Sequence, residues 1–109
     1  MIDSRIRTVL DALQDCIAAC EHCASSCLQE EDVKMMANCI RTDRDCADIC
    51  RLTAAFLARG SVHGKHLLRE CIEICRACGE ECAKHHHDHC QQCAEACFRC
   101  AEACESIAS

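Results

Sequence analysis

Apolar positions recur every three or four residues in four stretches of this chain, and no stretch shows the alternation typical of a β-strand. The pattern predicts helices over residues 4–29, 32–59 and 62–84, and a fourth from Asp88 to the end of the chain. The candidate N-caps are Ser4, Asp32, Ser61 and Asp88, with Gln91 in the capping-box position after Asp88. Gly60 suits the position just after a helix end. An average repeat of 3.5 residues with short connections predicts an all-α fold, an antiparallel up-down four-helix bundle.

Cysteine makes up much of the inward stripe of each predicted helix. The chain has 16 cysteines and only 2 aromatic side chains, so thiols must fill much of the core as small hydrophobes. The bundle is therefore expected to enclose a lumen lined by cysteines, and the candidate metal ligands are Cys16, Cys20, Cys23, Cys27, Cys39, Cys46, Cys50, Cys71, Cys75, Cys78, Cys82, Cys90, Cys93, Cys97, Cys100 and Cys104.

The register of the stripes predicts two different ends for this lumen. In an antiparallel bundle one end gathers the methionines and the histidine run, with Met36, His85 and His89 as possible accessory ligands at a mouth. The other end gathers aliphatic side chains and is expected to be plugged by Ile6, Val9, Leu13, Phe56, Leu57, Leu67, Leu68 and Ile107.

Composition narrows the function classes. The chain of 109 residues is expected to form one domain over 1–109. It has no apolar run long enough to span a membrane and no secretory signal, so a cytoplasmic location is expected, where disulfides rarely persist. A net charge of −6 without Trp or Tyr argues against nucleic-acid binding. No nucleophile lies beside an orienting base, so no enzymatic activity is expected.

Seven Cys-x-x-x-Cys pairs point to metal chemistry. Their Cβ atoms are expected about 5–6 Å apart on a helix, too far for an easy disulfide. A linear sulfur–metal–sulfur unit spans about 4–5 Å and suits a two-coordinate soft ion. Zinc in Cys₄ sites would bury net negative charge with no Lys or Arg pointing inward. A monovalent ion replaces one proton per thiol, and thiolates favour Cu(I), so about one Cu(I) per cysteine is expected.

Four segments carry a resemblance to a known family: "CIAACEHCASSC", "CIRTDRDCADIC", "CIEICRACGEEC" and "HCQQCAEACFRCAEAC". They closely resemble the bacterial copper storage proteins, and the match covers essentially the whole chain. The resemblance implies Cu(I) stored inside a four-helix bundle that assembles as a homotetramer, with a copper chaperone as a candidate partner. The lack of a signal resembles the cytosolic branch, which also has histidines near the mouth, and His85 and His89 occupy that place here.

One position departs from the family pattern. Asp43 lies between Cys39 and Cys46, where the stripe would continue with cysteine. It is expected either to act as an oxygen ligand or to turn outward and leave a gap. Two other functions stay open. One is a zinc or general soft-metal buffer, and the other is a thiol redox protein, suggested by Cys-x-x-Cys spacings such as 20/23 and 90/93.

Overall fold

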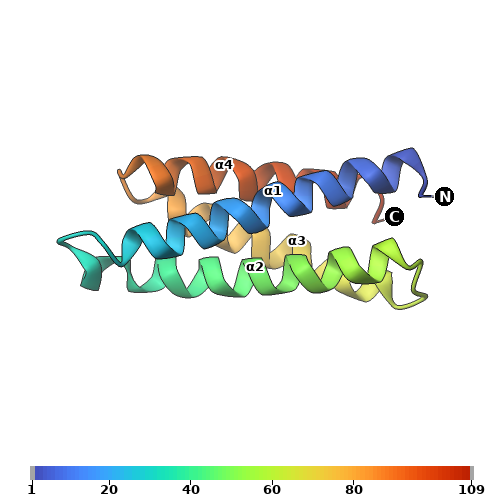
Figure 1. Ribbon diagram of the computed structural model, residues 1–109, viewed down its shortest axis with the longest axis horizontal. Coiled ribbons are helices and arrows are strands. Elements are labelled where there is room, and N and C mark those ends of the chain that lie inside the picture. The colour runs from blue at the N-terminus through green and yellow to red at the C-terminus, as the bar shows by residue number, and fades with distance from the viewer. Residues whose placement is uncertain (1, 109) are drawn as a thin grey trace.

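The computed structural model describes residues 2–108 and consists of helices joined by short connections. The elements are α1 (Ser4–Cys27), a 3₁₀ turn η1 (Val33–Met36), α2 (Ala37–Ala58), α3 (Gly64–Ala83) and α4 (Asp88–Glu105). Each helix runs antiparallel to the next one along the chain, and the two termini lie at the same end (Figure 1). The predicted all-α, up-down four-helix bundle is confirmed.

The bundle is a narrow rod of 46 × 19 × 19 Å. Helix α1 packs against α2 and α4, and α3 packs against the same two helices. The side chains between the four helices therefore form a core along the long axis of the bundle. No helix among residues 2–108 is both long enough and apolar enough to cross a membrane.

The helix ends differ from the predicted ones by a few residues. Asp3, not Ser4, caps α1, and its Oδ1 accepts a hydrogen bond from the Arg5 N–H at 2.7 Å. The segment expected to open the second helix forms η1 instead, so α2 starts at Ala37. Asp88 is the first residue of α4 and not its cap, which is His87. Adjacent polar residues compete for the cap position at each helix end, so the sequence alone located these ends only to within a few residues.

Two connections hold the helix ends together. Gly60 adopts φ 65° just after α2, as its predicted position requires, and the Ser61 N–H donates to the Phe56 carbonyl at 3.0 Å. Between α3 and α4, the Gln91 side chain donates to the carbonyls of Ala83 and His85 at 3.1 and 2.6 Å. Gln91 therefore ties the start of α4 to the end of α3, and does not form the expected capping box.

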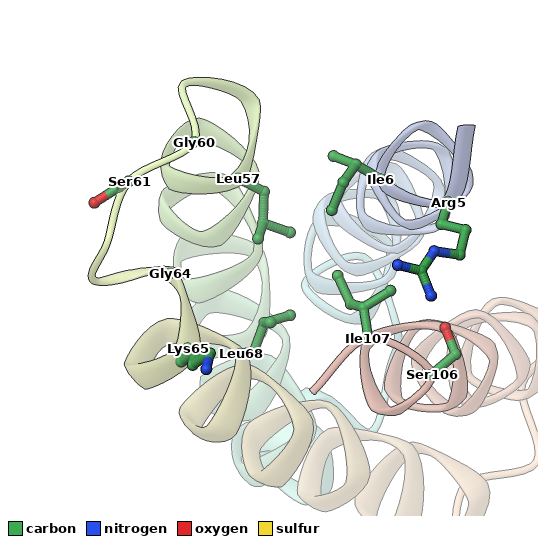
Figure 2. A pocket seen from close by; sticks show the side chains of 10 residues that line it. All are labelled: Arg5, Ile6, Leu57, Gly60, Ser61, Gly64, Lys65, Leu68, Ser106 and Ile107. Carbon is green, nitrogen blue, oxygen red and sulfur yellow. The ribbon is translucent and has the colours of Figure 1, made fainter. Parts of the chain in front are cut away.

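The aliphatic part of the core lies toward the end with the termini. Val9, Leu13 and Leu68 are buried there, beyond the last thiols. Farther out, Ile6, Leu57, Leu68 and Ile107 point toward one another from four segments (Figure 2). They line an open pocket of about 440 Å³ with Arg5 and Lys65 among its other lining residues. The expected plug is therefore present, but its outer part is incompletely filled.

We expect Leu13→Ala to lower the free energy of unfolding of the reduced apo-protein by about 2–5 kcal/mol, because Leu13 is fully buried and the bundle has few other large apolar side chains to close the cavity. Urea unfolding followed by circular dichroism measures the change. Leu52→Ala, at a position that is 47% exposed, is the matched control and should change stability by less than about 1 kcal/mol. Equal losses in the two variants would show that Leu13 does not anchor the core.

Candidate metal centre

All sixteen cysteines point into the core of the bundle. Each has no solvent-exposed surface, and each is a free thiol. The inward position follows from the spacing, because steps of three and four keep one side chain per turn on the same face of a helix. Cysteine and alanine are small enough to allow the four helices to pack closely around this column of sulfur atoms.

The thiols of neighbouring helices interdigitate along the axis of the bundle and form a lattice of sulfur atoms. Sulfur atoms on different helices approach closely, with Sγ–Sγ distances of 3.6 Å for Cys16–Cys46 and for Cys46–Cys75 and 3.7 Å for Cys20–Cys97. Near the histidine-rich end, Cys39 and Cys82 are 3.3 Å apart. An ion bound at one site would therefore lie next to the sulfur ligands of the adjacent site.

The lattice divides into overlapping groups of four sulfur atoms that lie within 4.8 Å of one another. A cysteine often belongs to more than one group, so the groups cannot all hold separate four-coordinate ions at once. The overlap favours ions that share thiolates along the column. Five of these groups are Cys16/Cys46/Cys50/Cys75, Cys16/Cys20/Cys46/Cys97, Cys20/Cys78/Cys93/Cys97, Cys23/Cys27/Cys39/Cys90 and Cys50/Cys71/Cys75/Cys100.

The Cys-x-x-x-Cys pairs are closer than the linear unit expected from the sequence. The Sγ–Sγ distances of pairs 16/20, 23/27, 71/75, 78/82 and 93/97 lie between 3.8 and 4.0 Å. With metal–sulfur bonds of about 2.3 Å, sulfur atoms lie about 4.6 Å apart across a linear unit and about 4.0 Å apart across an angle of about 120°. The resting lattice therefore fits a metal ion shared by three thiolates better than a two-sulfur clip.

Asp43 points into the lumen, so the outward orientation that the sequence left open does not occur. It is fully buried, and its Oδ1 accepts hydrogen bonds from the thiols of Cys78, Cys93 and Cys82 at 3.2, 3.2 and 3.3 Å. The expectation of an outward Asp43 is wrong, because three thiols inside the lumen donate to its carboxyl group. Its Oδ2 lies 3.9 Å from the sulfur of Cys39.

Burial raises the pKa of Asp43 far above its usual range, and any negative charge on the neighbouring Cys93 would raise it further. A charged carboxylate here would be far from water and from any Lys or Arg, since Asp43 and Thr53 are the only buried polar side chains among residues 2–108. The folded apo-protein therefore keeps Asp43 as a neutral acid. In this state the carbonyl oxygen accepts from thiols and the lumen stays uncharged.

The histidine-rich end places one imidazole against the thiols. His89 Nδ1 lies 3.5 Å from the sulfur atoms of Cys23 and Cys90 and 4.0 Å from that of Cys27. Hydrogen bonds, first from the thiol of Cys39, lower the pKa of Cys23 to about 5, whereas burial raises the pKa of Cys90. The mouth thus places the sulfur of Cys23, the more acidic of these two thiols, beside an imidazole nitrogen.

The other candidates at this end lie farther from the thiols. His85 Nε2 is 2.9 Å from Glu81 Oε2 and has no hydrogen bond to a thiol among the described contacts. Met36 is buried under the mouth, while Met35 is 74% exposed. His87, which the sequence did not single out as a candidate ligand, has its Nδ1 2.7 Å from Glu30 Oε2. Glu30 was missed entirely, because no motif links it to residues almost sixty positions away.

Known proteins that are similar to this chain agree with this geometry. The family model for copper storage proteins matches residues 2–109. The cysteine-rich protein YhjQ of Bacillus subtilis (strain 168) is 49% identical to this chain over 100 residues, which are 92% of this chain and 93% of that protein. The chain belongs to the copper storage protein family.

Solved structures of the family have the same fold. Cu(I)-bound BsCsp3 of Bacillus subtilis is 47% identical, with a TM-score of 0.93 over 96% of this chain and 99% of that one. A cytosolic copper storage protein from Streptomyces lividans, in a form with five coppers, is 40% identical, with a TM-score of 0.93 over 96% and 92% of the two chains. The buried thiol column therefore lies in a fold that is known to carry copper in these relatives.

We expect Asp43→Asn to stabilise the reduced apo-protein, and the gain to grow with pH. The folded pKa of Asp43 is raised, so the unfolded chain loses a proton above about pH 4 that the folded protein keeps. The stability of the wild type therefore falls, relative to the variant, by at most about 1.4 kcal/mol per pH unit. Urea unfolding at about pH 4 and about pH 7 tests this.

Asp45→Asn removes an exposed carboxylate from the same helix and is the control for this comparison. It should change stability little at either pH. A difference between wild type and Asp43→Asn that stays constant between the two pH values would contradict a neutral Asp43.

Proposed function

We propose that this copper storage protein holds many Cu(I) ions at once, about one for each cysteine, and releases them without performing catalysis. The observation that carries the proposal is the column of sixteen fully buried, free thiols, with no buried cationic side chain among residues 2–108. Each Cu(I) that displaces one thiol proton leaves the charge of the core unchanged, so ions can be added along the whole column.

The proposed ligands are the sixteen cysteines, with His89 as an accessory ligand at the mouth, whereas Asp43 stays a neutral acid inside. His89 supports the role through its Nδ1, which faces three thiols. His85 and Met36 lie next to the mouth, where a role in handling copper before it reaches the thiols is more compatible with their positions than stable ligation.

The cellular setting extends this proposal. The Streptomyces lividans relative is described as cytosolic, and sixteen free thiols suit a reducing compartment, so a cytoplasmic store is proposed here. The single bundle of 1–109 is proposed to act as one domain. Self-association into a homotetramer is supported by apolar side chains outside the lumen, such as Phe98, which is 37% exposed. A copper chaperone is the proposed partner for delivery.

A zinc buffer is the main alternative, and its stoichiometry separates it from copper storage. Four-thiolate zinc sites that share no ligands would use up sixteen thiols with four ions, each site carrying net negative charge into the core. Titration of the reduced apo-protein with Cu(I) against a chelator should saturate near sixteen ions, one for each cysteine. Saturation at one or two ions would favour a redox or carrier protein, and tighter binding of about four zinc ions would favour the buffer.

We expect Asp43→Cys to raise the Cu(I) capacity by about one ion, because a thiol at this position would continue the lattice toward Cys78, Cys82 and Cys93. Copper bound after gel filtration, divided by protein concentration, gives the number. Asp43→Asn, which adds no thiol at the same site, is the control. An unchanged capacity in Asp43→Cys would indicate that Asp43 already serves as a ligand.

A further inference from the structure

Two connections meet across the mouth of the bundle through one carboxylate. Glu30 lies in the connection between α1 and η1, and His87 and His89 lie at the start of α4. The Oε2 atom of Glu30 is 2.7 Å from His87 Nδ1 and 3.1 Å from His89 Nε2. The His87 and His89 rings are parallel within 4°, with centroids 5.3 Å apart. His87 also contacts Asp32 Oδ1 at 3.3 Å, so the connection is held at two points.

The two nitrogens of His89 face opposite environments. Nε2 faces Glu30 on the outside, and Nδ1 faces the sulfur atoms of Cys23, Cys27 and Cys90 inside. A neutral imidazole has one N–H group and one lone pair, and an ionised carboxylate can only accept. Glu30 therefore selects the form of His89 with its proton on Nε2, which leaves the lone pair of Nδ1 directed at the thiols.

Neighbouring acidic groups cannot take over this contact. Glu81 is engaged with His85 at 2.9 Å and with Lys84 at 3.5 Å. Asp32 contacts the far side of His87 and not His89. Glu30 is also only 27% exposed in its side chain and His89 only 14%, so their contact is sheltered from water more than a surface ion pair is.

We infer that Glu30 is a positioning residue for copper capture, which orients His89 so that its Nδ1 and the thiols of Cys23, Cys27 and Cys90 form one ligand set at the mouth. Carboxylates in this relation to a metal-binding histidine fix its tautomer and ring orientation, and their loss typically weakens metal binding about 10–100-fold. The inference rests on the proposed function, because it concerns Cu(I) arriving at this end of the column. His87 has a supporting part, since it holds the same carboxylate oxygen.

The first experiment needs no copper. In reduced apo-protein with ¹⁵N-labelled histidine, long-range ¹H–¹⁵N spectra report which nitrogen of His89 carries the proton. The wild type should show one form, protonated at Nε2, at a pH where the ring is neutral. Glu30→Ala should show both tautomers in exchange, whereas Glu31→Ala, which removes an exposed neighbouring carboxylate, should keep the wild-type spectrum. A single Nε2-protonated form in Glu30→Ala would overturn the inference.

The second experiment measures Cu(I) at the mouth itself. The His89 ring signals are followed in wild type and Glu30→Ala while Cu(I) is buffered by a chelator. Cu(I) release to the chelator and the total copper count are measured for these two proteins, for His89→Ala and for the double variant. Glu30→Ala should need about tenfold more free Cu(I) to shift the His89 signals. Because Glu30 acts through His89, Cu(I) release from the double variant to the chelator should match that from His89→Ala alone.

The outcomes separate this inference from the storage function. A total near one ion per cysteine in all four proteins, with weaker mouth binding only where Glu30 or His89 is changed, supports it. Additive effects of the two substitutions, or an equal effect of Glu31→Ala, would mean that Glu30 acts through the overall charge of the mouth and would overturn it. A low total copper count in the wild type would instead contradict copper storage.

Discussion

A buried thiol is easily accommodated while it keeps its proton, but a buried thiolate without a counter-ion is expensive. This cost controls the whole core. Sixteen sulfur atoms lie inside a rod only 19 Å across, and no buried cationic side chain offsets them in the described chain. A cargo that replaces protons one for one is therefore the one that the column can accept in quantity. The same constraint explains why Asp43 is held as a neutral acid among thiols.

The four helices make this chemistry possible because they bring small side chains together along the axis of the bundle. Steps of three and four place a thiol on most inward turns, and antiparallel packing interleaves thiols from adjacent helices at 3.6–3.7 Å, as in Cys16–Cys46 and Cys20–Cys97. Overlapping sets of four sulfur atoms run from Cys20/Cys78/Cys93/Cys97 to Cys50/Cys71/Cys75/Cys100. The contacts of Cys82 with Cys39 and Cys78, at 3.3 and 3.9 Å, link the group at the mouth to these sets. The cost of this design is a thin aliphatic core, concentrated around Val9, Leu13 and Leu68 at the opposite end. Metal binding would add contacts that the apo-protein lacks.

Much of this arrangement could be predicted from the sequence, since the heptad spacing alone determines which side chains face inward. The inward position of all sixteen cysteines and the two unlike ends of the bundle follow from that spacing. Other features depend on contacts between distant residues. The direction of Asp43 was undecided because a carboxyl group is buried only where donors happen to surround it. The Glu30–His89 contact was invisible for the same reason, because a flexible connection and the first turn of α4 meet only in the folded bundle.

The most direct test of the account is anomalous X-ray scattering from crystals of the fully Cu(I)-loaded protein. We expect a row of copper positions along the bundle axis, from the Cys23/Cys27/Cys39/Cys90 group at the mouth to the Cys50/Cys71/Cys75/Cys100 group. Neighbouring ions should share thiolates, and the helices should keep the positions that they have in the apo-protein. Copper confined to one or two sites, or bound mainly on the surface while the buried thiols remain empty, would contradict it.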